Sequence, residues 1–148
     1  MSVRLRILFV CENQRLGSRF QGCLEREGCR LLLATDSERA TRTLLAAAAF
    51  DAVLIHHDDL VRGSTLASGL KLLRPAVPVL LLTATWPSSG ALPAGVDALC
   101  YAASLTRRVA HDITRFVRRL LVEAGQHPVD ELGIGDSDFL ARTPPYLN

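Results

Sequence analysis

The chain has 148 residues, 49% of them hydrophobic, and this length and apolar content predict one compact domain with a sizeable core plus a tail. Lys and Arg number 17 against 15 for Asp and Glu, a near balance that indicates neither a nucleic-acid-binding surface nor an acidic substrate. The apolar run near the N-terminus is too short to span a membrane and lacks a small-residue cleavage site, so we expect a cytoplasmic protein without membrane association.

Segments of strand and helix character alternate along the first 124 residues. Continuous apolar runs, typical of strands buried on both faces, predict five strands over residues 3–10, 29–34, 51–56, 79–83 and 98–102. Apolar residues at helical spacing predict four helices over residues 15–27, 38–48, 65–73 and 106–124. Gly28 stands where the first helix needs a C-terminal cap, and Asp36 and Ser37 can cap the second. A polar loop is expected over residues 57–64.

The connection between the fourth and fifth strands breaks this alternation. Residues 84–97 contain Pro87, Pro93, Gly90 and Gly95, and proline and glycine both disfavour a helix interior. We therefore expect a loop or at most one helical turn, with Trp86 covering the sheet edge or anchoring a partner.

Strands that alternate with helices imply right-handed crossovers and a parallel sheet covered on both faces. The predicted fold is a flavodoxin-like, doubly wound α/β sandwich with a five-stranded parallel sheet and a fourth helix that is short or missing. Its functional crevice should lie at the carboxyl ends of the strands. The residues expected there are Cys11, Glu12, His56, Thr83 and Ala102.

Over residues 3–123 the order of elements resembles a response-regulator receiver domain of the CheY-like superfamily. The matching segments are Ile7-Leu-Phe-Val10 before the acidic pair, Phe50-Asp51-Ala-Val-Leu-Ile55 before the phospho-acceptor, Pro78-Val-Leu-Leu-Leu-Thr83-Ala84 ending in the hydroxyl residue, and Gly95-Val-Asp97-Ala-Leu99 leading into the last strand.

Active receivers need an acceptor aspartate, two acidic residues for Mg²⁺, a lysine and a hydroxyl. Matched position by position, the acidic pair falls on Cys11 and Glu12, the acceptor on His56 and the hydroxyl on Thr83. The lysine falls on Ala102, with Ala103 at the proline that follows it. The resemblance therefore implies a degenerate pseudo-receiver without catalytic residues or cofactor, which acts as a signal-transduction module by binding another protein.

Two enzymatic or phospho-accepting alternatives remain open. A shifted register would make Asp58 or Asp59 the acceptor of a genuine receiver, since Asp58 points to the same side of an extended strand as His56. The opening residues 7–11 also resemble low-molecular-weight phosphatases with Cys11 as nucleophile. That chemistry needs an arginine to bind phosphate oxygens, and its position is taken by Gly17, with Arg15 and Arg19 each two residues away.

Cysteine and histidine suggest little metal chemistry. The four cysteines show no zinc or disulfide spacing, so we expect free thiols at Cys11, Cys23, Cys29 and Cys100. His56 and His57 are adjacent on a strand and should face opposite sides, so a site formed with Glu12, Cys11 and Asp58 is not expected.

The last helix carries the clearest surface pattern. Its predicted apolar face is Val109, Ile113, Phe116, Val117 and Leu120, and a basic stripe lies opposite, interrupted by Asp112 and Glu123. A solvated face is the simpler interpretation; the functional one is a docking surface for a protein partner or a homodimer. The partner-binding candidates are Trp86, Tyr101, Arg108, His111, Arg115 and Arg119. Nucleic-acid binding is disfavoured because no known DNA-binding motif is present.

We place the receiver-like domain at residues 1–124 and a C-terminal tail, partly flexible or docked, at residues 125–148. Phe139 and Leu140 are apolar enough to dock on the domain or on a neighbour, as are Tyr146 and Leu147. The tail's acidic residues could meet the basic helix within the chain or between chains: Asp130, Glu131, Asp136 and Asp138.

Overall fold

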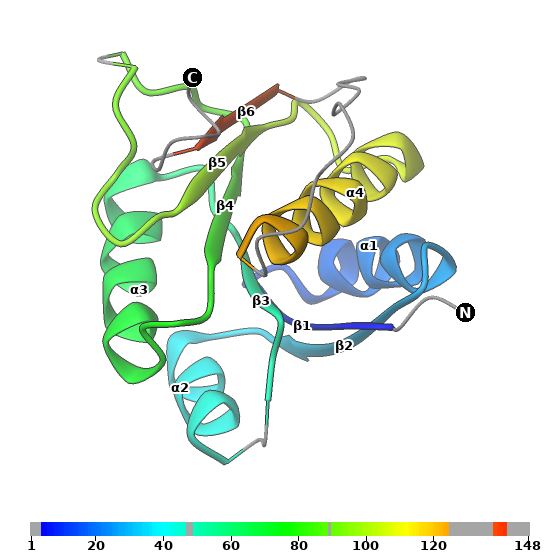
Figure 1. The fold of residues 1–148 in the computed structure, drawn as a ribbon. Coiled ribbons are helices and arrows are strands. Elements are labelled where there is room, and N and C mark those ends of the chain that lie inside the picture. The colour runs from blue at the N-terminus through cyan, green and yellow to red at the C-terminus, as the bar shows by residue number, and fades with distance from the viewer. Residues whose placement is uncertain (1–3, 47–48, 89, 125–137, 142–148) are drawn as a thin grey trace.

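A computed structural model describes residues 4–46, 49–88, 90–124 and 138–141. They form one sheet in the order β2-β1-β3-β4-β5-β6 with helices on both faces (Figure 1). The strands are β1 Leu5–Cys11, β2 Cys29–Ala34, β3 Ala52–His56, β4 Val79–Thr83, β5 Ala98–Tyr101 and β6 Asp138–Ala141. The helices are α1 Gln14–Arg26, α2 Ser37–Ala46, α3 Leu60–Leu73 and α4 Arg107–Ala124. The first five strands are parallel, which confirms the predicted flavodoxin-like sandwich.

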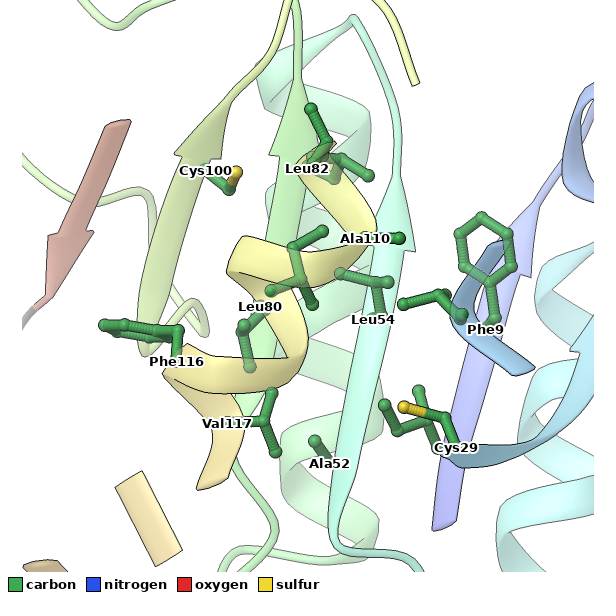
Figure 2. Close-up of a cluster of buried hydrophobic side chains, with 14 of the residues drawn as sticks. Phe9, Cys29, Ala52, Leu54, Leu80, Leu82, Cys100, Ala110, Phe116 and Val117 are labelled. Atoms are coloured by element: carbon green, nitrogen blue, oxygen red, sulfur yellow. The ribbon is translucent and has the colours of Figure 1, made fainter. Parts of the chain in front are cut away.

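Two apolar layers enclose the sheet because successive strand residues point to opposite faces. Leu80 and Leu82 pack with residues of α1 and α4, whereas Leu81 packs with residues of α2 and α3. Figure 2 shows part of the first layer, where side chains of β3, β4 and β5 gather beneath Ala110, Phe116 and Val117 of α4. The predicted inner face of α4 is buried throughout.

Local signals set the ends of α1. The Asn13 side chain accepts a hydrogen bond from the backbone N–H of Leu16 at 3.0 Å, which satisfies one of the free donors of the first turn. At the other end Gly28 has a φ of +93°, a conformation that favours glycine. The predicted cap at Gly28 is therefore confirmed.

The predicted start of α3 was wrong. The helix begins at Leu60 rather than at residue 65, so the polar loop after β3 is much shorter than expected. Asp59 provides the physical reason, because its carboxylate accepts hydrogen bonds from the backbone N–H groups of Val61 and Arg62 and so caps the helix.

The connection from β4 to β5 contains no helix in its described residues, 84–88 and 90–97, as its prolines and glycines predict. It lies instead along α3. The Ser64 hydroxyl donates to the carbonyl of Ala94 at 2.7 Å, and Gly95 sits directly against the backbone of Ser68.

The sixth strand was not predicted. β6 pairs antiparallel with the outer edge of β5, with Asp138 opposite Tyr101 and Ala141 opposite Ala98 (Figure 1). Phe139 and Leu140 thus belong to a segment docked on its own domain, one of the two options that the sequence left open. The expectations for Asp130, Glu131, Asp136, Tyr146 and Leu147 fall outside the described residues. Within the described part, no helix has both the length and the apolar character needed to span a membrane.

Candidate functional site

The carboxyl ends of the strands bring the expected crevice residues together in two pairs. Cys11 of β1 and His56 of β3 are register partners. Thr83 ends β4, and the backbone N–H of Ala102, just after β5, donates to its carbonyl at 2.9 Å. Glu12 follows Cys11 directly, so all five positions lie along one edge of the sheet.

Cys11 and His56 contact each other in the middle of this edge. The Cys11 Sγ lies 3.8 Å from Nδ1 of His56 and 3.4 Å from the carbonyl oxygen of Asn13, to which the thiol donates. Burial raises the pKa of the Cys11 thiol above its ordinary value; the Asn13 hydrogen bond acts against this and the charge of Glu12 adds to it. Because a cysteine nucleophile must be a thiolate, this environment is poorly suited to attack on phosphate.

The phosphatase alternative also lacks its arginine. Gly17, at that position, is buried in α1, and a Cβ added to it would lie 3.2 Å from the Cβ of Cys11 and 3.1 Å from a methyl of Leu33. The site around the thiol is therefore apolar on this side.

His57 connects two loops of the crevice. Its Nε2 lies 3.0 Å from Oε1 of Glu12, and its Nδ1 accepts a hydrogen bond from the backbone N–H of Asp59 at 3.0 Å. Since Nδ1 accepts, the ring proton is assigned to Nε2, which donates to the carboxylate. His57 thereby ties the loop after β1 to the loop after β3. It lies against Gly63 of α3, on the face opposite His56, as the strand geometry predicts.

The two alternative acceptors, Asp58 and Asp59, both bind backbone donors. Asp58 Oδ1 accepts from the N–H of Ala84 at 2.9 Å, across the end of β4, and Asp59 caps α3. The Thr83 hydroxyl, buried at the end of β4, accepts from the N–H of Thr85 at 3.0 Å. Each of these three side chains therefore accepts a hydrogen bond that stabilises the backbone of a loop or helix end at this edge.

The residues do not fit the Mg²⁺ that receiver chemistry uses. Magnesium prefers carboxylate and carbonyl oxygens in octahedral geometry. Here the corresponding side chains are a thiol, an imidazole and one carboxylate, and Glu12 is already bonded to His57. Over the described residues no group of three or more His, Cys, Asp or Glu side chains is arranged to hold a metal ion.

Two hollows open at this edge of the sheet. A recess of about 330 Å³ is lined by Glu12, His56, His57, Asp58 and Asp59. A larger cleft of about 530 Å³ extends towards α2 and α3, and its further lining residues include Thr35, Asp36, Ser37, Arg62 and Thr65. Sequence reasoning missed these residues, because their proximity depends on how the helices pack and no local pattern marks it.

The predicted basic stripe on α4 is largely paired. Arg108 lies 3.6 Å from Asp112, His111 Nδ1 lies 2.9 Å from Glu27 at the C-terminal cap of α1, and Arg119 lies 3.2 Å from Glu123. Asp112 and Thr114 are buried, so α4 is covered over a wider arc than its apolar residues indicated. Arg115 is exposed. This arrangement weakens the case for a continuous basic docking surface.

Trp86 and Tyr101 form an aromatic pair beside β5. Their ring centroids lie 6.0 Å apart at an interplanar angle of 80°, an edge-to-face contact that aromatic rings favour. Trp86 remains 42% exposed. Tyr101 therefore holds the Trp86 ring in place on one side, while part of that ring stays accessible to solvent.

The pKa of His56 predicts a specific dependence of stability on pH. Burial lowers this pKa below its ordinary value of 6.5, the charge of Asp58 opposes the effect and His57 reinforces it. The unfolded chain therefore takes up a proton near that ordinary value while the native chain resists it, so the His56 contribution favours folding above it and is lost as pH falls. Urea unfolding between about pH 7.5 and about pH 5.5 should show a smaller stability loss for His56→Gln than for the unchanged chain. Equal losses in both proteins would contradict the role given to His56.

No protein-family model and no curated protein matches the chain in sequence. Solved structures do match in fold. A response regulator receiver domain protein (CheY-like) from Methanospirillum hungatei JF-1 has 22% identity and a TM-score of 0.67, covering 84% of this chain and 98% of that one. The signal receiver domain of an HD domain-containing protein from Pseudomonas fluorescens Pf-5 has 21% identity and a TM-score of 0.66, with coverages of 86% and 96%.

A two-component response regulator from Clostridium difficile gives a similar result, with 18% identity, a TM-score of 0.65 and coverages of 80% and 98%. At these identities the likeness concerns the fold. Together with the strand order and the five parallel strands described above, it shows that this chain has the flavodoxin-like α/β fold of CheY-like receiver domains.

Proposed function

We propose that this protein is a phosphorylation-independent regulatory module that acts through protein binding, similar to an atypical response regulator. The observation that carries the proposal is the Cys11–His56 contact, which fills the centre of the crevice with a thiol and an imidazole. A receiver needs carboxylates at both of these positions.

Charge is the main argument against phosphorylation. Transfer of a phosphoryl group to a carboxylate requires a cation between the two anions and a further positive group to bind the product. His56 offers no carboxylate, Cys11 a protonated thiol, and Ala102 a buried methyl group in place of an amine. Burial also lowers the pKa of His56, so the imidazole is neutral at neutral pH and supplies no positive charge.

Protein side chains join the loops around the crevice. The His57–Glu12 hydrogen bond connects the first and third loops, and the bond from Ala84 N–H to Asp58 connects the third and fourth. These links stabilise the loop arrangement seen in the structure, which fits a module whose binding surface does not depend on a phosphoryl signal.

A protein partner is the expected ligand. The surface near β5 exposes part of Trp86 next to Tyr101, and aromatic side chains of this kind are enriched where proteins bind one another. Arg115 is exposed on α4, whereas Arg108, His111 and Arg119 are paired with acids. A homodimer through this surface is one form that the binding could take.

Intact-mass measurement tests the phosphorylation part of the proposal. The purified protein is incubated with Mg²⁺ and a small-molecule phosphodonor, alongside a receiver domain that retains its acceptor aspartate as a positive control. We expect no phosphoryl adduct on this chain, because the site lacks the acceptor and the cation ligands.

A phosphoryl adduct would overturn the proposal, and the residue that carries it would show which alternative function is correct. If Asp58→Asn or Asp59→Asn abolished it, the chain would be a phospho-accepting receiver with a shifted register. If Cys11→Ser abolished it, the phosphatase-like chemistry would be the better account.

A further inference from the structure

The outer edge of β5 is the feature of the sheet that the proposed function leaves unexplained. β5 bonds to β4 on one side, and on the other its backbone groups face β6, which comes from beyond residue 137 (Figure 1). Without β6, β5 would be an edge strand with unpaired N–H and C=O groups, which readily bind another extended chain.

The two edges of the sheet differ in composition. β2, the other outermost strand, carries an exposed charged residue, Arg30, near its start, and such a charge discourages strand addition. In β5, Ala98, Leu99 and Cys100 are fully buried and apolar, and the strand contains neither charge nor proline. The apolar residues of β5 therefore favour a covered edge, and the strand has no charge or proline that would disfavour pairing with another extended segment.

We propose that the outer edge of β5 is a docking site for an extended segment of a partner protein, and that residues 138–141 of the chain occupy this site in the absence of the partner. The inference rests on the proposed function for the nature of the partner. The bound β6 itself shows what the edge accepts: an extended segment, antiparallel to β5, over four paired residues.

The register defines the chemistry of the occupant. The chain's own segment places Asp138 opposite Tyr101, then Phe139, Leu140 and Ala141 opposite Cys100, Leu99 and Ala98. A partner segment should accordingly carry an acidic residue, two large apolar residues and a small one in that order. Main-chain hydrogen bonds would supply affinity and the side chains selectivity, as in other cases of strand addition.

The occupying segment is suited to exchange. It is four residues long, it pairs with one strand, and residues 125–137 separate it from α4. Ordering each residue opposes much of what a backbone hydrogen bond contributes, so a short edge strand gains little net stability. Because the segment belongs to the same chain, its effective concentration at the β5 edge is about millimolar. A partner whose segment pairs better with β5 can compete with it at this concentration.

The sole tryptophan reports on the edge. Trp86 packs against Tyr101, the residue opposite Asp138, so its fluorescence should change when β6 leaves. The test uses the full chain with Phe139→Pro and Leu140→Pro together. Proline has no N–H to donate to a neighbouring strand, and because the N–H groups of consecutive strand residues point to opposite sides, one of the two substitutions removes an N–H that points towards β5. Asp130→Pro with Glu131→Pro is the matched control in the connecting stretch.

The probe is a labelled peptide with the sequence of residues 136–143, and a scrambled peptide serves as its control. We expect the Phe139→Pro/Leu140→Pro chain to bind the probe at least about tenfold more tightly than the unchanged chain, in which the tethered segment competes. The Asp130→Pro/Glu131→Pro chain should behave like the unchanged chain. Equal, negligible binding by all three chains would overturn the proposal.

Hydrogen exchange of the unchanged protein gives a second, independent measurement that does not depend on a variant folding. Amides of β5 that face β6 should exchange much faster than amides of the same strand that face β4, because β6 opens separately. Equal protection of the two sets would mean that β6 is a permanent part of the sheet and would overturn the proposal.

Failure here is distinguishable from failure of the proposed function. Loss of the strand-docking result leaves the phosphoryl-adduct experiment untouched, and a phosphoryl adduct would leave peptide binding at β5 untouched. Light scattering separates a further outcome. A dimer that forms in the unchanged chain and disappears in the Phe139→Pro/Leu140→Pro chain would show strand exchange between copies and overturn the commitment to a different partner protein.

Discussion

Replacing Gly95 with alanine is expected to lower the free energy of unfolding by about 3 kcal/mol. Two effects combine at this residue. Its φ of +81° is strained for any residue with a Cβ, and that Cβ would lie 2.5 Å from the backbone nitrogen and 2.6 Å from the Cα of Ser68. Because these are backbone atoms of α3, the loop or the helix must shift as a whole.

Gly90→Ala is the matched control. Gly90 has a φ of +72° in the same connection, and among the described residues, its chain neighbours aside, no atom lies within 4 Å of an added Cβ. It should cost only the backbone strain, about 1 kcal/mol. Urea unfolding of the two variants separates the close contact from the strain. Adding Ser68→Ala to Gly95→Ala should recover little, since it removes the Oγ contact and keeps the backbone ones. Similar stabilities for the Gly95 and Gly90 variants would show that the loop is not packed tightly on α3.

The fold could be predicted because its signals are local and repeated. Each parallel strand appears as a continuous apolar run, and the prolines and glycines of residues 84–97 remove the helix that would otherwise follow β4. These patterns fix the order of elements, and short right-handed connections then leave few arrangements open.

The start of α3 was missed although a signal was present. Asp59 precedes an apolar segment and is a common capping residue, but the charged and histidine residues around it favoured a loop. β6 had no comparable signal. A four-residue segment inside a tail rich in glycine and proline gives no usable periodicity, and its pairing depends on the composition of the β5 edge.

The positions of the candidate site residues could be predicted from the strand ends, whereas their hydrogen-bond partners could not. Sequence patterns place Cys11 and His56 at the carboxyl edge, but the hydrogen bonds of His57 to Glu12 and of Ala84 to Asp58 depend on side-chain rotamers and loop paths. Similarly, the acid that pairs with His111 caps the end of α1 and the acid that pairs with Arg108 lies one turn further along α4, so the charge pattern alone overstated the free basic surface.

Asp97→Ala is expected to lower the free energy of unfolding by about 2 kcal/mol. Asp97 stands just before β5, at the end of the sheet opposite the crevice. Its Oδ2 accepts from the only lysine of the chain, Lys71, at 2.6 Å and from the backbone N–H of Val79 at 2.8 Å. Lys71 also donates to the carbonyl of Val77 at 3.0 Å, so one carboxylate joins α3, the start of β4 and the start of β5.

Removing the carboxylate takes the counter-ion from a partly buried ammonium, which keeps its bond to the Val77 carbonyl, and leaves the strand N–H of Val79 without this acceptor. The loss should therefore exceed that of an ordinary surface ion pair. Lys71→Met should cost less, because Asp97 keeps its bond from Val79. Glu38→Ala is the control: it removes the Arg42–Glu38 pair on α2, whose side chains are 70% and 79% exposed, and should cost less than about 0.5 kcal/mol. Urea unfolding should therefore rank the losses as Asp97→Ala, Lys71→Met and Glu38→Ala. An Asp97→Ala loss as small as that of Glu38→Ala would mean that water replaces the carboxylate at both donors, and that the β4–β5 connection is held by its other contacts, among them the Ser64–Ala94 hydrogen bond and the packing of Gly95 on α3.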